Sequence, residues 1–166
     1  MNYRILQPQD AEQWIAIRTE ALDAVPFAFG RTNQDEDLER KQFLLEQTNG
    51  KDNFIFGAFD DEKLVGVAGF YQYDTVKNNH KGMIWSVYVS PSRQGKGIGK
   101  KLMELLLNHA WKLEGLDHIL LSVSANMMAA HRLYKSLGFE QYGLEPNCLK
   151  INGEYQDAIL MALKRG

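Results

Sequence analysis

The chain has 166 residues, of which 45% are hydrophobic and 24% are charged, as in globular domains and unlike disordered, collagen-like or coiled-coil proteins. It has 19 Lys and Arg residues and 21 Asp and Glu residues, and the resulting net charge of −2 argues against duplex nucleic acid as the main partner. The single cysteine, Cys148, excludes an internal disulfide framework and a cysteine-cluster metal site, and we expect it to be an idle thiol.

The sequence shows neither a targeting segment nor a division into parts. The first residues, 1–6, lack the apolar run of a signal peptide, and no stretch approaches the roughly 18 uncharged apolar residues of a membrane span. No internal repeat or low-complexity linker interrupts the alternation of predicted strands and helices. We therefore expect a soluble, cytoplasmic protein with one α/β or α+β domain over residues 1–166, and neither a membrane nor nucleic acid as partner.

The first predicted elements are a short strand over residues 3–6 and two helices. Asp10 and Gln13 are spaced like a capping box, and Pro26 closes the helix that follows them. That helix carries apolar residues at helical spacing, namely Trp14, Ile17, Ala21 and Leu22. The charged segment 35–47 has a partial apolar face and predicts the second helix.

Three strand candidates follow, over residues 53–59, 64–73 and 82–89, each rich in apolar and aromatic residues. Asp60-Asp61 is a good hairpin connection between the first two strands, and Asn78-Asn79 lies in the loop before the third. We expect the three strands to pair as an antiparallel meander.

A strongly amphipathic helix comes next. Apolar residues recur at steps of three and four from Leu102 to Leu113, which predicts a helix of about 15 residues that runs about 22 Å across one face of the sheet. With the strand before it and a short apolar strand over 119–123, this helix forms a βαβ crossover.

The last third predicts one more helix and two more strands. The helix covers 128–137 and stops at Gly138, a residue that often ends helices. The strands cover 139–142 and 158–163, and a polar loop over 144–156 lies between them. The whole chain thus predicts about seven strands and about four helices.

A glycine-rich segment, Gln94-Gly95-Lys96-Gly97-Ile98-Gly99-Lys100, joins the third meander strand to the amphipathic helix. Alternating glycines let the main chain approach a ligand closely, and the first N–H groups of a helix suit phosphate oxygens. The segment alone fits a plain connecting turn equally well. It is not a Walker A loop, because Lys101 stands where that motif needs Ser or Thr. It is not a dinucleotide fingerprint, because Lys100 stands where the third glycine belongs.

These residues resemble the GNAT superfamily of N-acetyltransferases. Its acetyl-CoA signature, Gln/Arg-x-x-Gly-x-Gly/Ala, is matched by Gln94, Gly97 and Gly99. A second pattern, Ala-Ala-x-x-Leu-Tyr-x-x-x-Gly-Phe, is matched by Ala129-Ala130, Leu133-Tyr134 and Gly138-Phe139. The resemblance covers nearly the whole chain in element order. It implies a mixed α+β fold with a mostly antiparallel, twisted sheet that splays between its fourth and fifth strands.

The resemblance also implies the chemistry. Acetyl-CoA would be the cosubstrate, no metal would take part, and acetyl would pass directly to a primary amine. Main-chain groups of Val87 and Val89 would pair with the pantetheine arm, and one of their N–H groups would face the thioester oxygen. Tyr134 would give a proton to the departing thiolate. The pyrophosphate would be held by the N–H groups of Gln94, Gly95, Lys96, Gly97, Ile98, Gly99 and Lys100.

Two residues depart from the family pattern. Met83 stands near the place of a glutamate that serves many relatives as general base, and Met127 replaces an asparagine that contacts the coenzyme. Asn126, one residue earlier, is expected to cap the helix or to reach the coenzyme. The remaining candidates for a base, acting directly or through water, are His80, Glu145, Glu154, Tyr155 and Asp157.

The acceptor site is expected beside Phe27 and Phe29, in an apolar loop between the first two helices, and beside Trp85, Tyr155 and Asp157. The ending over 150–157 is similar to that of polyamine acetyltransferases, and the acids near it favour a small cationic acceptor. A protein or peptide acetyltransferase and a coenzyme-binding module without turnover are the alternatives. The oligomeric state, including a homodimer, stays open.

Overall fold

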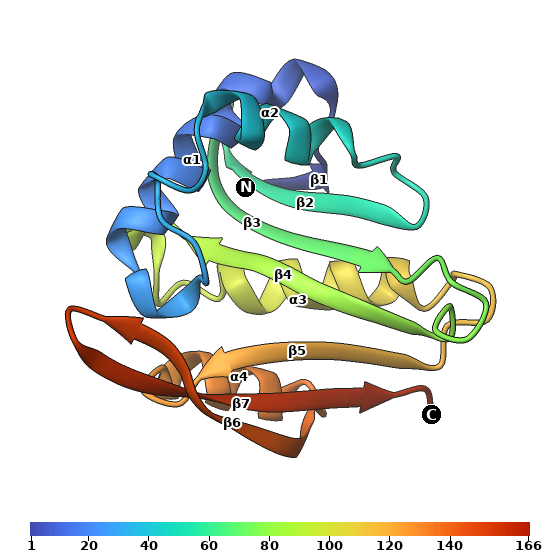
Figure 1. Ribbon diagram of the computed structural model, residues 1–166. Coiled ribbons are helices and arrows are strands. Elements are labelled where there is room, and N and C mark those ends of the chain that lie inside the picture. Colours follow the sequence, from blue (N-terminus) through green and yellow to red (C-terminus); the bar gives the residue numbers. More distant parts are fainter.

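The computed structural model describes residues 1–166 and contains one seven-stranded sheet in the order β1-β2-β3-β4-β5-β7-β6 (Figure 1). All neighbouring strands are antiparallel except β4 and β5, which are parallel and joined by a helical crossover. The α+β class, the meander and the crossover are confirmed. The strands are β1 Asn2–Ile5, β2 Asn53–Asp60, β3 Lys63–Gln72, β4 Lys81–Val89, β5 His118–Ser124, β6 Glu140–Ile151 and β7 Glu154–Lys164.

Four α-helices cover the two faces of the sheet (Figure 1). Helices α1 (Ala11–Ala24) and α2 (Leu38–Glu46) pack on one face, and α3 (Ile98–Ala110) and α4 (Met128–Ser136) pack on the other. The alternation of side chains along β2 supplies both cores, because Phe54 and Phe56 face α3 whereas Ile55 faces α1. Three short 3-10 turns complete the chain, at Pro8–Asp10 (η1), Pro26–Ala28 (η2) and Pro91–Arg93 (η3).

The predicted polar loop over 144–156 is wrong, because that segment forms most of a long hairpin between β6 and β7. Its turn is Asn152-Gly153, and both residues have positive φ, the geometry that two-residue hairpins prefer. Strand β6 is the sheet edge and most of its residues are exposed, so it lacks the apolar alternation that would have marked it as a strand.

The predicted capping box of α1 is also wrong. The Asp10 carboxylate accepts two hydrogen bonds from Arg4, at 2.6 and 2.7 Å, and one from the Gln7 amide at 2.7 Å. These bonds lower the pKa of Asp10. The Gln13 side chain instead donates a hydrogen bond to the Glu62 carbonyl in the β2–β3 turn and accepts one from the Leu64 N–H at the start of β3. The pair therefore ties the first helix to strands β1 and β3 rather than capping it.

Candidate functional site

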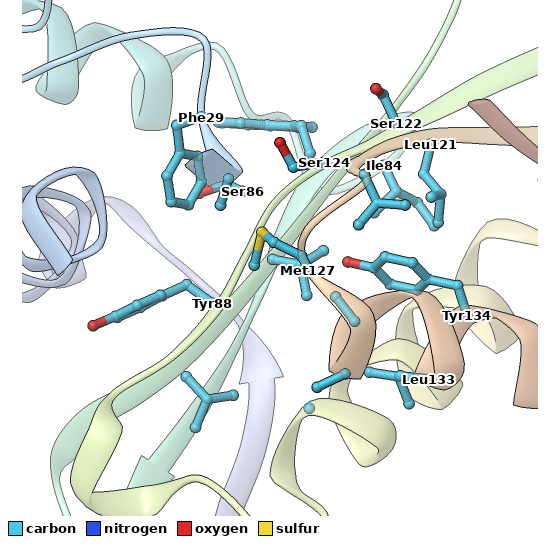
Figure 2. Close-up of a pocket in the computed structure, with 18 of the residues that line it drawn as sticks. Phe29, Ile84, Ser86, Tyr88, Leu121, Ser122, Ser124, Met127, Leu133 and Tyr134 are labelled. Atoms are coloured by element: carbon cyan, nitrogen blue, oxygen red, sulfur yellow. The ribbon is translucent and has the colours of Figure 1, made fainter. Parts of the chain in front are cut away.

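Strands β4 and β5 pair only at one end, and the space where they separate opens into a large cavity. Three residue pairs, from Lys81↔His118 to Met83↔Leu120, hold the two strands together. Beyond them lies a cavity of about 850 Å³ that reaches both faces of the sheet. Its walls come from β4, β5, the start of α3, α4, the segment after α1, and α2 (Figure 2).

The start of α3 closes one end of this cavity with free main-chain donors. None of the N–H groups from Gly95 to Lys100 donates a hydrogen bond within the chain, and no side chain caps the helix. Gly95 and Gly97 have φ of 74° and 77°, which is why these two positions need glycine. Six consecutive amides at a helix N-terminus present partial positive charge and suit an anion such as a diphosphate.

Val89 and Gln94 connect this donor segment to the strand. The Gln94 amide Nε2 donates to the Val89 carbonyl at 2.9 Å, which ties the segment to the end of β4. Ser90 N–H donates to Val65 on the β3 side, so the polar main-chain groups of Val89 and Val87 point to the opposite, β5 side. Val87 has no strand partner there, because the pairing with β5 ends at Met83.

A β-bulge in β4 decides which side chains face which half of the cavity. Ser86 has φ of 54°, and the pairing with β3 shifts register between Val67 and Gly69. Trp85 and Ser86 consequently both lie on the α1 side, where Trp85 contacts Trp14 with ring centroids 6.0 Å apart. Without the extra residue, the strict alternation of β4 would place Tyr88 on the α3 side, with Ile84.

A buried ion pair supports the bulge from the α1 side. Arg18 donates to both carboxylate oxygens of Glu36, at 2.9 and 2.7 Å, and its third nitrogen donates to Ser86 Oγ at 3.0 Å. The Arg18 and Glu36 side chains are only 7% and 1% exposed. Lys41 Nζ donates to the Glu36 main-chain carbonyl. The network joins α1, the segment before α2, and β4 into one rigid wall of the cavity.

Tyr134 on α4 stands at the junction of the cavity's two halves. Its hydroxyl makes no hydrogen bond within the chain and points toward the middle of the cavity beside Met127, with Ser86 and Phe29 across from it (Figure 2). Burial raises the pKa of Tyr134 above its ordinary value, so the phenol stays protonated near neutral pH. It can therefore donate a hydrogen bond or a proton to a group in the cavity.

The structure brings most of the predicted site residues to this one cavity. Eleven of them line it: Phe29, Trp85, Val87, Val89, Gln94, Gly95, Gly97, Ile98, Gly99, Lys100 and Tyr134. Lys96 is exposed outside it, although its N–H belongs to the free set. Phe27, Tyr155 and Asp157 do not line it: Tyr155 is 57% exposed on the hairpin, and the Asp157 carboxylate accepts from the Asn147 amide.

The predicted role of Asn126 as a helix cap is wrong. The N-cap of α4 is Met127, which has no side-chain hydrogen bond, and Asn126 is exposed and outside the cavity. Met127 takes the position in the cavity wall instead. The start of α4 thus presents an apolar, adaptable side chain to the cavity.

None of the predicted bases lies in the cavity. His80 packs against His118 at the closed end of the β4–β5 pair, with ring centroids 5.9 Å apart, and the acidic candidates belong to the β6–β7 hairpin. The only carboxylate in the wall is Glu36, which the sequence did not single out. One signal pointed to its partner: Arg18 is a charged residue on the apolar face formed by Trp14 and Ala21.

Other chemistry-bearing groups lie outside the cavity. Cys148 is a free, half-buried thiol on β6, and burial and then Glu145 raise its pKa. No cluster of three or more His, Cys, Asp or Glu side chains that could hold a metal ion is present. No helix is long and apolar enough to span a membrane.

Comparison with known proteins points to one family. Residues 14–139 match the family model described as Acetyltransferase (GNAT) family. A spermine/spermidine N(1)-acetyltransferase from Bacillus subtilis is 35% identical over 103 residues, which cover 59% of this chain and 64% of that protein. A mycothiol acetyltransferase from Streptomyces scabiei is 31% identical over 134 residues, 81% of this chain and 41% of that protein. The chain therefore spans less than two-thirds of the length of these relatives.

Solved structures share the whole fold. A GNAT family acetyltransferase from Streptococcus pneumoniae superposes with a TM-score of 0.88 at 20% identity, covering 99% of both chains. A Salmonella typhimurium protein solved with its cofactor acetyl-CoA gives a TM-score of 0.87 at 23% identity, covering 99% of this chain and 93% of that one. The likeness extends across the splayed sheet and both helical layers.

Proposed function

Because this chain belongs to the GNAT family of acetyltransferases, we propose that it transfers the acetyl group of acetyl-CoA directly to the primary amine of a small molecule. One observation carries the proposal: a helix start with six consecutive free amides, an unpaired stretch of β4 and a protonated tyrosine border a single cavity. The names of the relatives, which mention polyamines and mycothiol, support a small-molecule acceptor.

Each part of the cavity has a proposed task. The amides from Gly95 to Lys100 bind the diphosphate of the coenzyme, and the main-chain groups of Val87 together with the Val89 N–H bind its pantetheine arm as an added strand would. The Val87 N–H stabilises the negative charge that develops on the thioester oxygen. As the acceptor nitrogen bonds to the acetyl carbon and the carbon–sulfur bond breaks, Tyr134 supplies a proton to the sulfur. The proton that the nitrogen loses on forming the amide leaves to water, and water returns a proton to Tyr134.

Calorimetric titration with coenzyme A tests the binding half of the proposal. We expect Gly97→Val to weaken coenzyme affinity about tenfold or more, because a β-branched residue is strained at φ of 77° and displaces the free amides. Gly153→Val in the distant hairpin turn, at φ of 85°, is the matched control: it carries similar strain and should leave affinity unchanged. Equal affinities for the two variants would contradict the assigned diphosphate site.

Thiol release from acetyl-CoA with a panel of primary amines tests the catalytic half. Release that depends on an added amine, together with the acetylated product, is the expected result. Coenzyme binding without release for any amine would favour a binding module and reject the proposed enzyme.

The dependence of the rate on pH tests whether the protein supplies a general base. The cavity wall contains no histidine, and its one carboxylate is held by Arg18, so the acceptor must lose its proton to water. We expect kcat/KM for an alkylamine of pKa near 10 to rise roughly tenfold per pH unit between about pH 6 and pH 9. The raised pKa of Tyr134 keeps the acid form present throughout this range.

An acceptor with a less basic amine supplies the control for this profile. An α-amino group of pKa near 8 should level off at about that pH, because the profile then follows the substrate. A plateau at a lower pH that is the same for both acceptors would instead reveal a base on the protein.

A further inference from the structure

The charges in the cavity wall are strongly unequal. Five basic residues line it, whereas a single acidic residue does, and that residue is Glu36. The basic residues are Arg18, Arg31, Arg40, Arg93 and Lys100. The acids that the sequence offered for a cationic acceptor, such as Glu145 and Asp157, lie outside the cavity.

Three of these five basic side chains either form an ion pair or lie at the proposed coenzyme end of the cavity. Arg18 is paired with Glu36 inside the wall, and Arg93 is paired with Asp60. Lys100 lies in the first turn of α3, at the end of the cavity assigned to the diphosphate. Their charges are neutralised locally or face the coenzyme, so they do not decide the acceptor.

Arg31 and Arg40 remain on the acceptor side without a carboxylate partner. Arg31 follows the apolar segment that contains Phe29, and Arg40 lies in the first turn of α2. Neither guanidinium is within 4.0 Å of a carboxylate oxygen. Arg40 stacks near the Phe43 ring, 5.2 Å from its centroid, which restricts the guanidinium without using its donors.

The acidic residues beside these arginines in the sequence do not line the cavity. The Asp35 carboxylate accepts from the Thr32 amide and hydroxyl, and these bonds and then the charge of Arg31 lower its pKa. Asp37 caps α2 by accepting from the Arg40 amide. Both carboxylates use their hydrogen-bonding capacity on the loop and the helix end, and neither Asp35 nor Asp37 lines the cavity, whereas Arg31 and Arg40 do.

We propose that the acceptor carries an oxyanion, a carboxylate or a phosphoryl or phosphonyl group, near its primary amine, and that Arg31 and Arg40 bind this oxyanion. The proposal rests on the acetyltransfer proposed above and adds the class of acceptor. A guanidinium presents paired donors that match such anions, and a charged hydrogen bond in a partly enclosed site is among the strongest that proteins make. A polyamine would bring a second ammonium to a wall that has no free carboxylate to receive it.

Matched pairs of acceptors test the assignment by thiol release. Each α-amino acid is compared with its carboxamide, and aminoalkylphosphonates and spermidine complete the panel. Because the amine of a carboxamide is less basic than that of its amino acid, release rates across this panel are compared per unprotonated amine. On that basis we expect kcat/KM to be about 10- to 100-fold higher for an anionic member than for its uncharged counterpart. The carboxylate and phosphonate arms show which oxyanion is preferred. Faster release with spermidine or with the carboxamides would overturn this inference and leave the acetyltransferase standing, whereas no release with any amine would overturn both.

Variants separate a binding role from a general loss of function. Arg31→Gln and Arg40→Gln should each raise KM for the preferred anionic acceptor about tenfold or more, with kcat and coenzyme affinity little changed. Arg132→Gln on α4, also exposed and unpaired but outside the cavity, is the control and should change neither. Rescue by Arg40→Lys should be partial, since lysine keeps the charge but not the paired donors. Equal KM values for the wild type and both Gln variants would overturn the inference.

Discussion

Replacing Arg18 by Met is expected to lower the free energy of unfolding by about 3–5 kcal/mol. The substitution keeps most of the side-chain volume but leaves the Glu36 carboxylate, 1% exposed, without its two charged hydrogen bonds. It also removes the donor to Ser86 Oγ. Urea unfolding followed by tryptophan fluorescence measures the loss, because Trp14 and Trp85 lie beside the network.

Two further variants identify the cause of that loss. Arg93→Met breaks the partly exposed pair with Asp60 and should cost about 1 kcal/mol or less, since water still screens such a pair. The double variant Arg18→Met/Glu36→Leu should recover at least half of the stability, because it removes the stranded charge together with its partner. A double variant as unstable as Arg18→Met alone would show that packing, rather than the buried charge, dominates.

The network matters because it supports an unfavourable main-chain conformation. Serine at φ of 54° is disfavoured by about 1–2 kcal/mol, and such conformations persist only where the surroundings hold them. Here the surroundings are Arg18, through its hydrogen bond to Ser86, and the register shift against β3. The bulge places Trp85 and Ser86 together on the acceptor side and leaves Val87 free beside the gap, so one strained residue serves both halves of the cavity.

Most of the fold follows from local patterns in the sequence. The apolar stripe of α3 and the three meander strands β2, β3 and β4 are largely buried, so hydrophobic patterning predicts them. The glycines of the donor segment at Gly95–Lys100 and its place before a helix are also local features, but alone they fit a connecting turn equally well, and the family resemblance was needed to assign the segment to a coenzyme. Short sequence motifs therefore predicted the part of the cavity that we propose for the coenzyme.

The acceptor half could not be predicted in this way, because it depends on contacts between distant residues. Arg18 and Glu36 meet Ser86 only through the packing of α1 on the sheet, and no spacing rule links these three positions. The acids of the last hairpin misled the prediction for the opposite reason: they are in or near the final strand in sequence, yet they belong to the part of the β6–β7 hairpin that lies outside the cavity. The position of an acidic residue in the sequence therefore does not show whether its side chain lines the cavity.

Tyr134→Phe is expected to lower kcat by about 100-fold or more, within the range for loss of a general acid. The hydroxyl has no hydrogen bond inside the protein, so its removal should leave the melting temperature and the affinity for coenzyme A nearly unchanged. Burial raises the pKa of Tyr134, so the wild-type phenol keeps its proton while the thiolate departs and can deliver it to sulfur. Steady-state kinetics at saturating substrates, with calorimetry for the coenzyme, measure both quantities.

Tyr88→Phe is the matched control, because Tyr88 also lines the cavity but directs its hydroxyl to Glu20, 2.8 Å away on α1 (Figure 2). Its loss should reduce stability by about 1 kcal/mol and change kcat little. If both variants slow turnover equally, the effect comes from packing around the gap and not from the proton. If Tyr134→Phe retains full turnover, the proton reaches the sulfur from solvent, and the role of Tyr134 reduces to shaping the cavity at the point where the two halves meet.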